Sequence, residues 1–161
     1  LDLGHFHPTE SVADKVSAIL LFSPGIVFHL SRGIHWDSDH VVILNDEILA
    51  LAEEIVSGRA LEKVQIALDY FDASLNRVGA WVAGARAALK AFLVALLQPE
   101  ERLKSAEQTG DNFERLALRE EAKAMPYGAV WDYHCLQTNV PQGAEWIAAI
   151  HKYEKEVLNK R

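Results

Sequence analysis

The sequence contains a single cysteine, Cys135, and few basic residues. One thiol cannot form an internal disulfide, and no charged segment followed by an apolar signal core directs export, so we expect a reducing, cytoplasmic location. The sequence has 16 Lys and Arg residues and 23 Asp and Glu residues, which gives a formal net charge of -7. Because an acidic chain repels phosphate backbones, nucleic acid is a poor candidate partner.

Long apolar runs are scarce as well. The longest, around residues 19–22 and 91–97, are too short or too interrupted by charge to cross a bilayer, so no membrane partner is expected. The sequence also has no Gly-rich phosphate loop and no Gly-x-Ser-x-Gly nucleophile motif. Its 50% hydrophobic composition, with 9% aromatic residues, is enough to bury one core.

Residues 1–98 are predicted to alternate strands and helices. Short β-branched and aromatic runs favour strands, whereas apolar residues at helical spacing favour helices. Thr9 and Asn45 are expected to cap the two helices, and Gly58 to end the second in a left-handed conformation. The predicted order is a strand at residues 1–3, a helix at 10–22, a strand at 26–30, a loop at 31–42, a helix at 45–58 and a strand at 64–68. This order predicts parallel βα units.

Residues 99–161 are predicted to be a helical C-terminal extension. It follows a long helix at residues 76–97 that Pro99 ends, and it is interrupted at Gly110, Pro126 and Pro141. The expected fold class is therefore α/β, with about three parallel strands followed by helices. Three strands cannot close a (β/α)₈ barrel, which needs about 250 residues. The chain also opens at Leu1 inside a predicted strand, so we expect part of a barrel that is completed elsewhere.

Acidic and histidine side chains follow each predicted strand. In parallel α/β folds the carboxyl ends of the strands meet at one edge, where the βα loops build active sites. We therefore expect these side chains to share one site. They are Asp2 and His5 after the first strand, His29, Asp37 and Asp39 at or after the second, and Asp69 after the third.

The chemistry of this set favours a divalent cation. Four carboxylates in one cleft repel one another unless a cation neutralises them. Carboxylate and imidazole donors without a thiolate suit Mn²⁺, Co²⁺, Mg²⁺ or Zn²⁺ rather than a cysteine-type structural zinc site. In extended backbone, Asp37 and Asp39 point to the same side and would grip one ion together.

Each residue also has a simpler interpretation. An Asp-x-Asp pair is more often a solvated loop, Asp69 alone would cap a turn, and His29 alone would be a hydrogen-bonded core histidine. It is the coincidence at three strand ends that favours a metal site. The other histidines are expected to be structural or surface residues, with His40 close enough to the site to support its ligands: His7, His35, His40, His134 and His151.

Three segments make the sequence resemble the L-rhamnose isomerase family. They are Asp2 to Glu10 (DLGHFHPTE), His29 to Gly33 (HLSRG) running into Trp36 to Val42 (WDSDHVV), and Leu68 to Ser74 (LDYFDAS). The similarity extends over essentially the whole chain. It implies a (β/α)₈ barrel related to that of xylose isomerase, a homotetramer, two divalent ions per site with Mn²⁺ as first choice, and interconversion of L-rhamnose and L-rhamnulose.

The resemblance also implies roles for the site residues. Asp2, His29 and Asp69 would hold a structural ion, and His5, Asp37 and Asp39 would hold the catalytic ion; which carboxylate bridges the ions stays open. Asp37 would orient the water that takes the hydroxyl proton during a hydride shift. The structural ion of the family takes a further Glu from the preceding barrel strand, which is absent from this sequence, so the chain alone is expected to be inactive.

Further interpretations remain beside this one. Phe71 or Tyr70 would form an apolar wall for the sugar, although packing at the barrel mouth is an equally good explanation. An apurinic-endonuclease-like barrel would use similar ligands, but the acidic composition argues against it. The chain would otherwise be a catalytically silent part that assembles with a complementary half, or part of a related barrel isomerase for another aldose.

Overall fold

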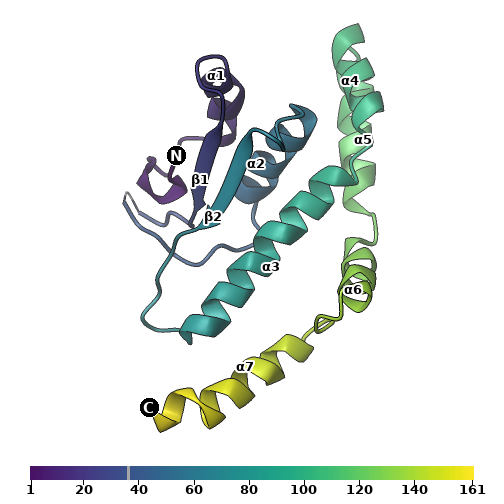
Figure 1. Cartoon of the computed structure of the whole chain (residues 1–161). Coiled ribbons are helices and arrows are strands. Elements are labelled where there is room, and N and C mark those ends of the chain that lie inside the picture. The colour runs from purple at the N-terminus through teal and green to yellow at the C-terminus, as the bar shows by residue number, and fades with distance from the viewer. Residues whose placement is uncertain (36) are drawn as a thin grey trace.

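Two parallel strands, β1 (Ile26–Leu30) and β2 (Val64–Leu68), form the sheet that positions the candidate site. In this computed structural model, which describes residues 1–35 and 37–161, Ile26 pairs with Val64 and Leu30 with Leu68. Helix α2 (Asp46–Ser57) connects the two strands (Figure 1). The predicted βαβ unit is therefore confirmed, whereas two strands do not by themselves make a barrel.

The strand predicted at residues 1–3 is wrong as a full strand. Asp2 forms a single parallel bridge with His29, and the His29 N–H donates to the Leu1 carbonyl over 2.8 Å. The chain then turns into the 3-10 helix η1 (Leu3–His5), because the Asp2 carboxylate accepts from the Gly4 N–H at 3.0 Å. This cap ends the extended backbone after one residue, yet it keeps Asp2 at the sheet.

The helix predicted at residues 10–22 is also shorter than expected. It consists of the 3-10 turn η2 (Ala13–Lys15) and the single α-helical segment α1 (Val16–Leu20). Thr9 does not cap it, since its hydroxyl lies 2.7 Å from Nδ1 of His7 instead. Neither segment has a side-chain cap, which explains the late start.

Helix α2 begins after Asn45 as predicted and ends at Ser57, but its left-handed exit lies one residue later than predicted. Oδ1 of Asn45 accepts from the Ile48 N–H at 3.2 Å, so the expected cap is confirmed. The expected left-handed exit at Gly58 is wrong, because Gly58 keeps a φ of -73° and donates to the Glu54 carbonyl. The left-handed residue is Arg59, with a φ of 53°.

The hydrophobic core lies between the sheet and helices α2 and α3 (Arg77–Leu96). Side chains alternate along β1, so that Phe28 and Leu30 are fully buried while Val27 and His29 are exposed. Within the described residues, α3 is the one helix that could span a membrane by length and composition. One third of this apolar stretch is buried, and a stripe of small residues on α3 packs toward the core: Ala80, Gly84, Ala87, Ala88, Ala91 and Ala95.

The predicted helical extension is confirmed. It follows the outside of α3 in Figure 1 and contains no strand between residues 99 and 161, all of which the structure describes. Gly110 ends the first of its helices at a φ of 74°, and Pro126 precedes the third. The helices are α4 (Glu100–Thr109), α5 (Asn112–Lys123), α6 (Tyr127–Gln137) and α7 (Glu145–Glu156), followed by the 3-10 turn η3 (Leu158–Lys160).

Candidate metal centre

Asp2, His29 and Asp69 form a first cluster at the carboxyl ends of the strands. The bridge to His29 holds Asp2 beside β1, and the Asp69 N–H donates to the Leu30 carbonyl at 3.1 Å. Nδ1 of His29 lies 3.2 Å from Oδ2 of Asp69 and 3.6 Å from Oδ2 of Asp2. Three residues separated along the chain therefore present one imidazole and two carboxylates to a common point.

A second cluster contains Asp2, His5 and Asp39. Nε2 of His5 lies 3.7 Å from Oδ2 of Asp2 and 3.9 Å from Oδ2 of Asp39. Asp37 joins through His5 alone, at 3.3 Å, and its side chain is 72% exposed. Asp37 has a φ of 56°, a left-handed conformation that an aspartate tolerates better than most residues. Both aspartates of the loop therefore approach Nε2 of His5, but not from extended backbone, and only Asp39 belongs to the cluster with Asp2.

Asp2 belongs to both clusters. Its Oδ1 accepts from the Gly4 N–H and lies 3.5 Å from the Ser31 hydroxyl, while its Oδ2 faces both His5 and His29. Only 16% of its side chain is exposed, the smallest fraction in the set. Among the described residues, Asp2 is thus the carboxylate whose position suits a bridge between two ions, a choice that the sequence left open.

The donor set fits divalent cations. The ligand atoms of each cluster lie within 4.8 Å of one another, a spacing that one ion bound to all of them allows. Oδ1 of Asp39 is buried without a hydrogen-bond partner in the described part of the chain, and a buried, unpaired carboxylate oxygen is costly. A cation beside Asp39 would offset that cost. The absence of a side chain at Gly4 lets the Asp39 carboxylate lie this close to the backbone. A Cβ at Gly4 would overlap Asp39 Oδ1 and lie 2.6 Å from the Ser38 carbonyl.

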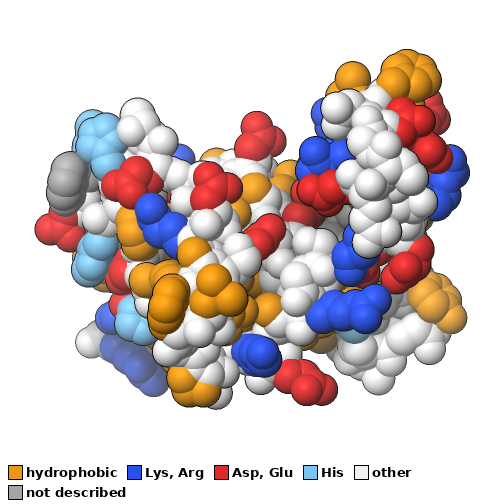
Figure 2. All heavy atoms as spheres, turned by 90° about the horizontal axis from the view of Figure 1, so that it is seen from above, with side chains coloured by type: hydrophobic (Ala, Val, Ile, Leu, Met, Phe, Trp, Pro, Cys, Tyr) orange, Lys and Arg blue, Asp and Glu red, His pale blue; other side chains and the backbone are white. Residues whose placement is uncertain are grey.

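The clusters lie at an open edge of the molecule. Histidine and acidic side chains gather at the left edge in Figure 2, which corresponds to the N-terminal segment and the neighbouring loops in Figure 1. The side chains of His5, His29 and Asp69 are 56%, 46% and 62% exposed. A small ligand would reach them, but these residues alone do not exclude water from the site.

The family model of L-rhamnose isomerase matches residues 1–161 of this chain. The chain belongs to the L-rhamnose isomerase family. It is 57% identical over all 161 residues to an L-rhamnose isomerase from Bacteroides thetaiotaomicron, and 51% identical to those from Rhodopirellula baltica and Salmonella paratyphi B. In each comparison the whole chain is covered but only 38% of the relative, so the chain spans less than half the length of these L-rhamnose isomerases.

Two loops that carry residues of the two clusters are tied together. The Phe71 N–H donates to the Asp39 carbonyl at 3.3 Å, and Arg32 and His40 pair across the base of the first loop. The pKa of Asp72 lies below its usual range, chiefly because the hydroxyl and backbone N–H of Ser74 donate to its carboxylate. The backbone of His40 thus helps to close the first loop, while a supporting role of its side chain for the cluster residues stays a prediction.

Sequence reasoning missed the residues that surround Phe71. Arg77 lies over the Phe71 ring and over the Trp81 ring. Arg77 and Trp81 belong to the first turns of α3. No motif signals this contact, because an arginine at the start of a helix has many surface roles. Of the other residues in the three motifs, Trp36 lies outside the described residues. His134 and His151 lie in α6 and α7, outside both clusters.

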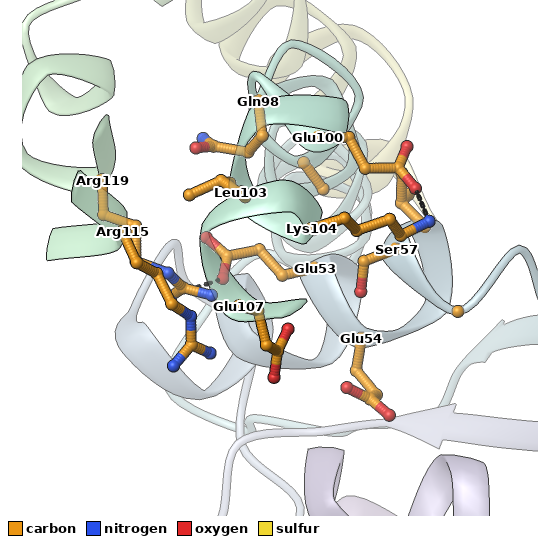
Figure 3. Close-up of a pocket in the computed structure, with 13 residues that line it drawn as sticks. Glu53, Glu54, Ser57, Gln98, Glu100, Leu103, Lys104, Glu107, Arg115 and Arg119 are labelled. Carbon is orange, nitrogen blue, oxygen red and sulfur yellow. Dashed lines mark hydrogen bonds and ion pairs between the residues drawn. The ribbon is translucent and has the colours of Figure 1, made fainter. Parts of the chain in front are cut away.

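A separate pocket of about 290 Å³ lies between α2, α4 and α5 (Figure 3). Its lining mixes acids and bases that neutralise each other: Arg119 donates to Glu53 at 3.2 Å, and Lys104 pairs with Glu100. Arg59 and Glu101 form a further ion pair at 3.4 Å between the end of α2 and α4. We interpret this pocket as a charged gap where the α4–α5 hairpin meets α2, not as a second reaction site.

Proposed function

We propose that this chain supplies metal-binding and catalytic residues of an L-rhamnose isomerase that interconverts L-rhamnose and L-rhamnulose. The observation that carries the proposal is the pair of ligand clusters that share Asp2. Two clusters joined by one carboxylate suit a two-ion site, and the names of the relatives indicate the reaction.

In this proposal each cluster holds one divalent ion. Asp2, His29 and Asp69 hold the structural ion, and Asp2, His5 and Asp39 hold the catalytic ion with Asp37 beside them. Mn²⁺ is our first choice, and Zn²⁺, Co²⁺ or Mg²⁺ would fit the same donors. When bound, the ions polarise the sugar carbonyl and acidify the neighbouring hydroxyl.

The side chains of the chain move a proton and orient the sugar. In the direction from aldose to ketose, the hydrogen on C2 moves to C1 with its electron pair, the O2 proton leaves, and O1 gains a proton. Asp37 is exposed beside His5, so we assign it the role of accepting the O2 proton, directly or through one water. Phe71, which is 63% exposed next to Asp69 and Tyr70, offers an apolar surface to the C–H face of the sugar.

The open surroundings of the site support a need for the rest of the isomerase. Ile66 and Leu68 of β2, which share a sheet face with Phe28 and Leu30, are 37% and 39% exposed, and the opposite face, which carries Val27 and His29, is exposed as well. Hydride transfer requires a site that excludes water. We therefore propose that the chain alone is catalytically silent, and that further barrel strands cover this face. A cytoplasmic homotetramer remains part of the proposal through the family resemblance.

Calorimetric titration with Mn²⁺ tests the site, and a chimera tests the reaction. The chimera is the Bacteroides thetaiotaomicron isomerase in which these 161 residues replace the matching segment. We expect two Mn²⁺ sites in the chain and turnover of L-rhamnose in the chimera only. Turnover of another aldose in preference to L-rhamnose would refute the substrate assignment. A folded chimera without any isomerase activity would refute the function.

A further inference from the structure

The segment Asp69–Phe71, directly after β2, is held on its inner side by the beginning of α3. The Tyr70 hydroxyl donates to the carbonyls of Ala80 and Trp81, each at 3.2 Å, and its side chain is only 8% exposed. Gly84 makes this possible, because a Cβ at that position would overlap the Tyr70 hydroxyl. Tyr70 therefore fixes the backbone on which Asp69 and Phe71 stand.

Phe71 is exposed and lies against a guanidinium group. Cζ of Arg77 lies 5.6 Å from the centre of the Phe71 ring and 5.3 Å from that of Trp81. In residues 1–35 and 37–161 no carboxylate lies at ion-pair distance from Arg77, so contact with the two rings is its visible interaction. A planar, weakly hydrated guanidinium stacks on aromatic faces better than an ammonium group does.

The place of Arg77 in its helix strengthens this interpretation. Asn76 caps α3, and Arg77 is the first residue of the helix. The positive end of the helix dipole lies there, so a cation is disfavoured at this position. The helix itself thus gains nothing from the charge, whereas the guanidinium lies over the exposed Phe71 ring.

We propose that Arg77 is a positioning residue that orients Phe71 beside the metal ligands. This inference rests on the proposed function, in which Phe71 forms a wall of the sugar site. Arg77 does not touch the reacting atoms; it acts through Phe71, whose N–H is already bound to the Asp39 carbonyl. Loss of Arg77 leaves the ligands in place but lets the ring turn away from the sugar.

The first test measures the ring itself in the isolated chain. We compare Arg77→Met, which keeps side-chain length without charge, with Arg77→Lys and with Arg86→Met. Arg86 is the matched control, because it also belongs to α3 and also stacks on two aromatic rings. Its Cζ lies 5.1 Å from the centre of the Trp131 ring and 5.6 Å from that of Trp146. NMR relaxation of the Phe71 ring is expected to show greater mobility in Arg77→Met, an intermediate value in Arg77→Lys and no change in Arg86→Met. Unchanged ring mobility in Arg77→Met would overturn the inference.

The second test measures kinetics in the chimera. Loss of a stacked cation at an exposed site is expected to raise KM for L-rhamnose by about threefold to fivefold in Arg77→Met. We expect kcat and Mn²⁺ affinity to stay within about twofold, and Arg77→Lys to recover part of the change. A fall in kcat or Mn²⁺ affinity without a change in KM would also overturn the inference. If the unsubstituted chimera lacks activity, the proposed function fails, while the ring measurement still decides whether Arg77 orients Phe71.

Discussion

Replacing Asp2 by Asn should affect both ion sites at once. Asn keeps an oxygen that accepts from the Gly4 N–H, now at 3.0 Å, so the 3-10 turn after Asp2 should persist. The substitution removes the charge of Oδ2, which lies 3.7 Å from His5 Nε2 and 3.6 Å from His29 Nδ1. Because this atom serves both clusters, neither ion keeps its full ligand set.

The size of the effect follows from the loss of one charged ligand, of which only 16% is exposed, beside histidines that are about half exposed. Loss of one partner of a fully buried pair costs about 3 to 5 kcal/mol, or roughly 10² to 5 × 10³ in affinity, and exposure of the histidines places the expected loss at the lower end of that range. Asp69→Asn is the matched control, because Asp69 belongs to one cluster only. Calorimetric titration with Mn²⁺ should find two sites in the wild-type chain, one at wild-type affinity in Asp69→Asn, and none at that affinity in Asp2→Asn. Two unaltered sites in Asp2→Asn, with an unchanged circular dichroism spectrum, would refute the shared-ligand reasoning.

Three other predictions concern catalysis, packing and pH. Asp37→Asn should abolish turnover in the chimera without changing its circular dichroism spectrum, since Asp37 is exposed and bonds no core group; retained wild-type turnover would refute its role. Tyr70→Phe should lower the free energy of urea unfolding by about 1 kcal/mol, and Gly84→Ala should lower it by about 1 to 3 kcal/mol. The cost of Gly84→Ala should be smaller in the Tyr70→Phe background but not zero, because the ring atom Cζ, 2.5 Å from the added Cβ, remains; additive costs would contradict the overlap with the hydroxyl. Burial raises the pKa of Glu47, so its contribution to stability is full below the unfolded-state pKa and is lost as pH rises through the folded-state value. Glu47→Gln should therefore gain stability relative to wild type between pH 4 and pH 7 in urea unfolding, and the opposite trend would disprove the assignment.

The elements that sequence reasoning located well are those with a strong burial pattern. β1, α2, β2 and α3 lie where apolar periodicity predicted them, and Asn45 caps α2 because its side chain fits the local N-cap geometry. Apolar periodicity and N-cap geometry depend on residues close together in the sequence. These elements could therefore be predicted without knowledge of the surrounding structure.

The errors arose where side chains compete for backbone groups. Asp2 accepts from the Gly4 N–H and turns the expected strand into a 3-10 helix, and His7 takes the Thr9 hydroxyl that was expected to cap a helix. Gly58 stays right-handed after α2, which places the left-handed position at Arg59 instead. Propensity and spacing do not determine such choices between nearby partners.

For the candidate site, strand-end reasoning brought together side chains that the structure also places within reach of one another. What it left open was the shared position of Asp2, because that depends on the bridge to His29 and on which oxygen the Gly4 N–H occupies. The contact of Arg77 with Phe71 was equally invisible, since it joins a loop to a helix through side chains alone. Assignment of ions and catalysis to these residues stays a prediction.

Anomalous X-ray diffraction from crystals of the chain grown with Mn²⁺ tests the central claim most directly. The account predicts two manganese peaks, one between Asp2, His29 and Asp69 and the other between Asp2, His5 and Asp39, with an oxygen of Asp2 as a ligand to both. A single ion bound without Asp2, or manganese located only at other carboxylates of the chain, would contradict it.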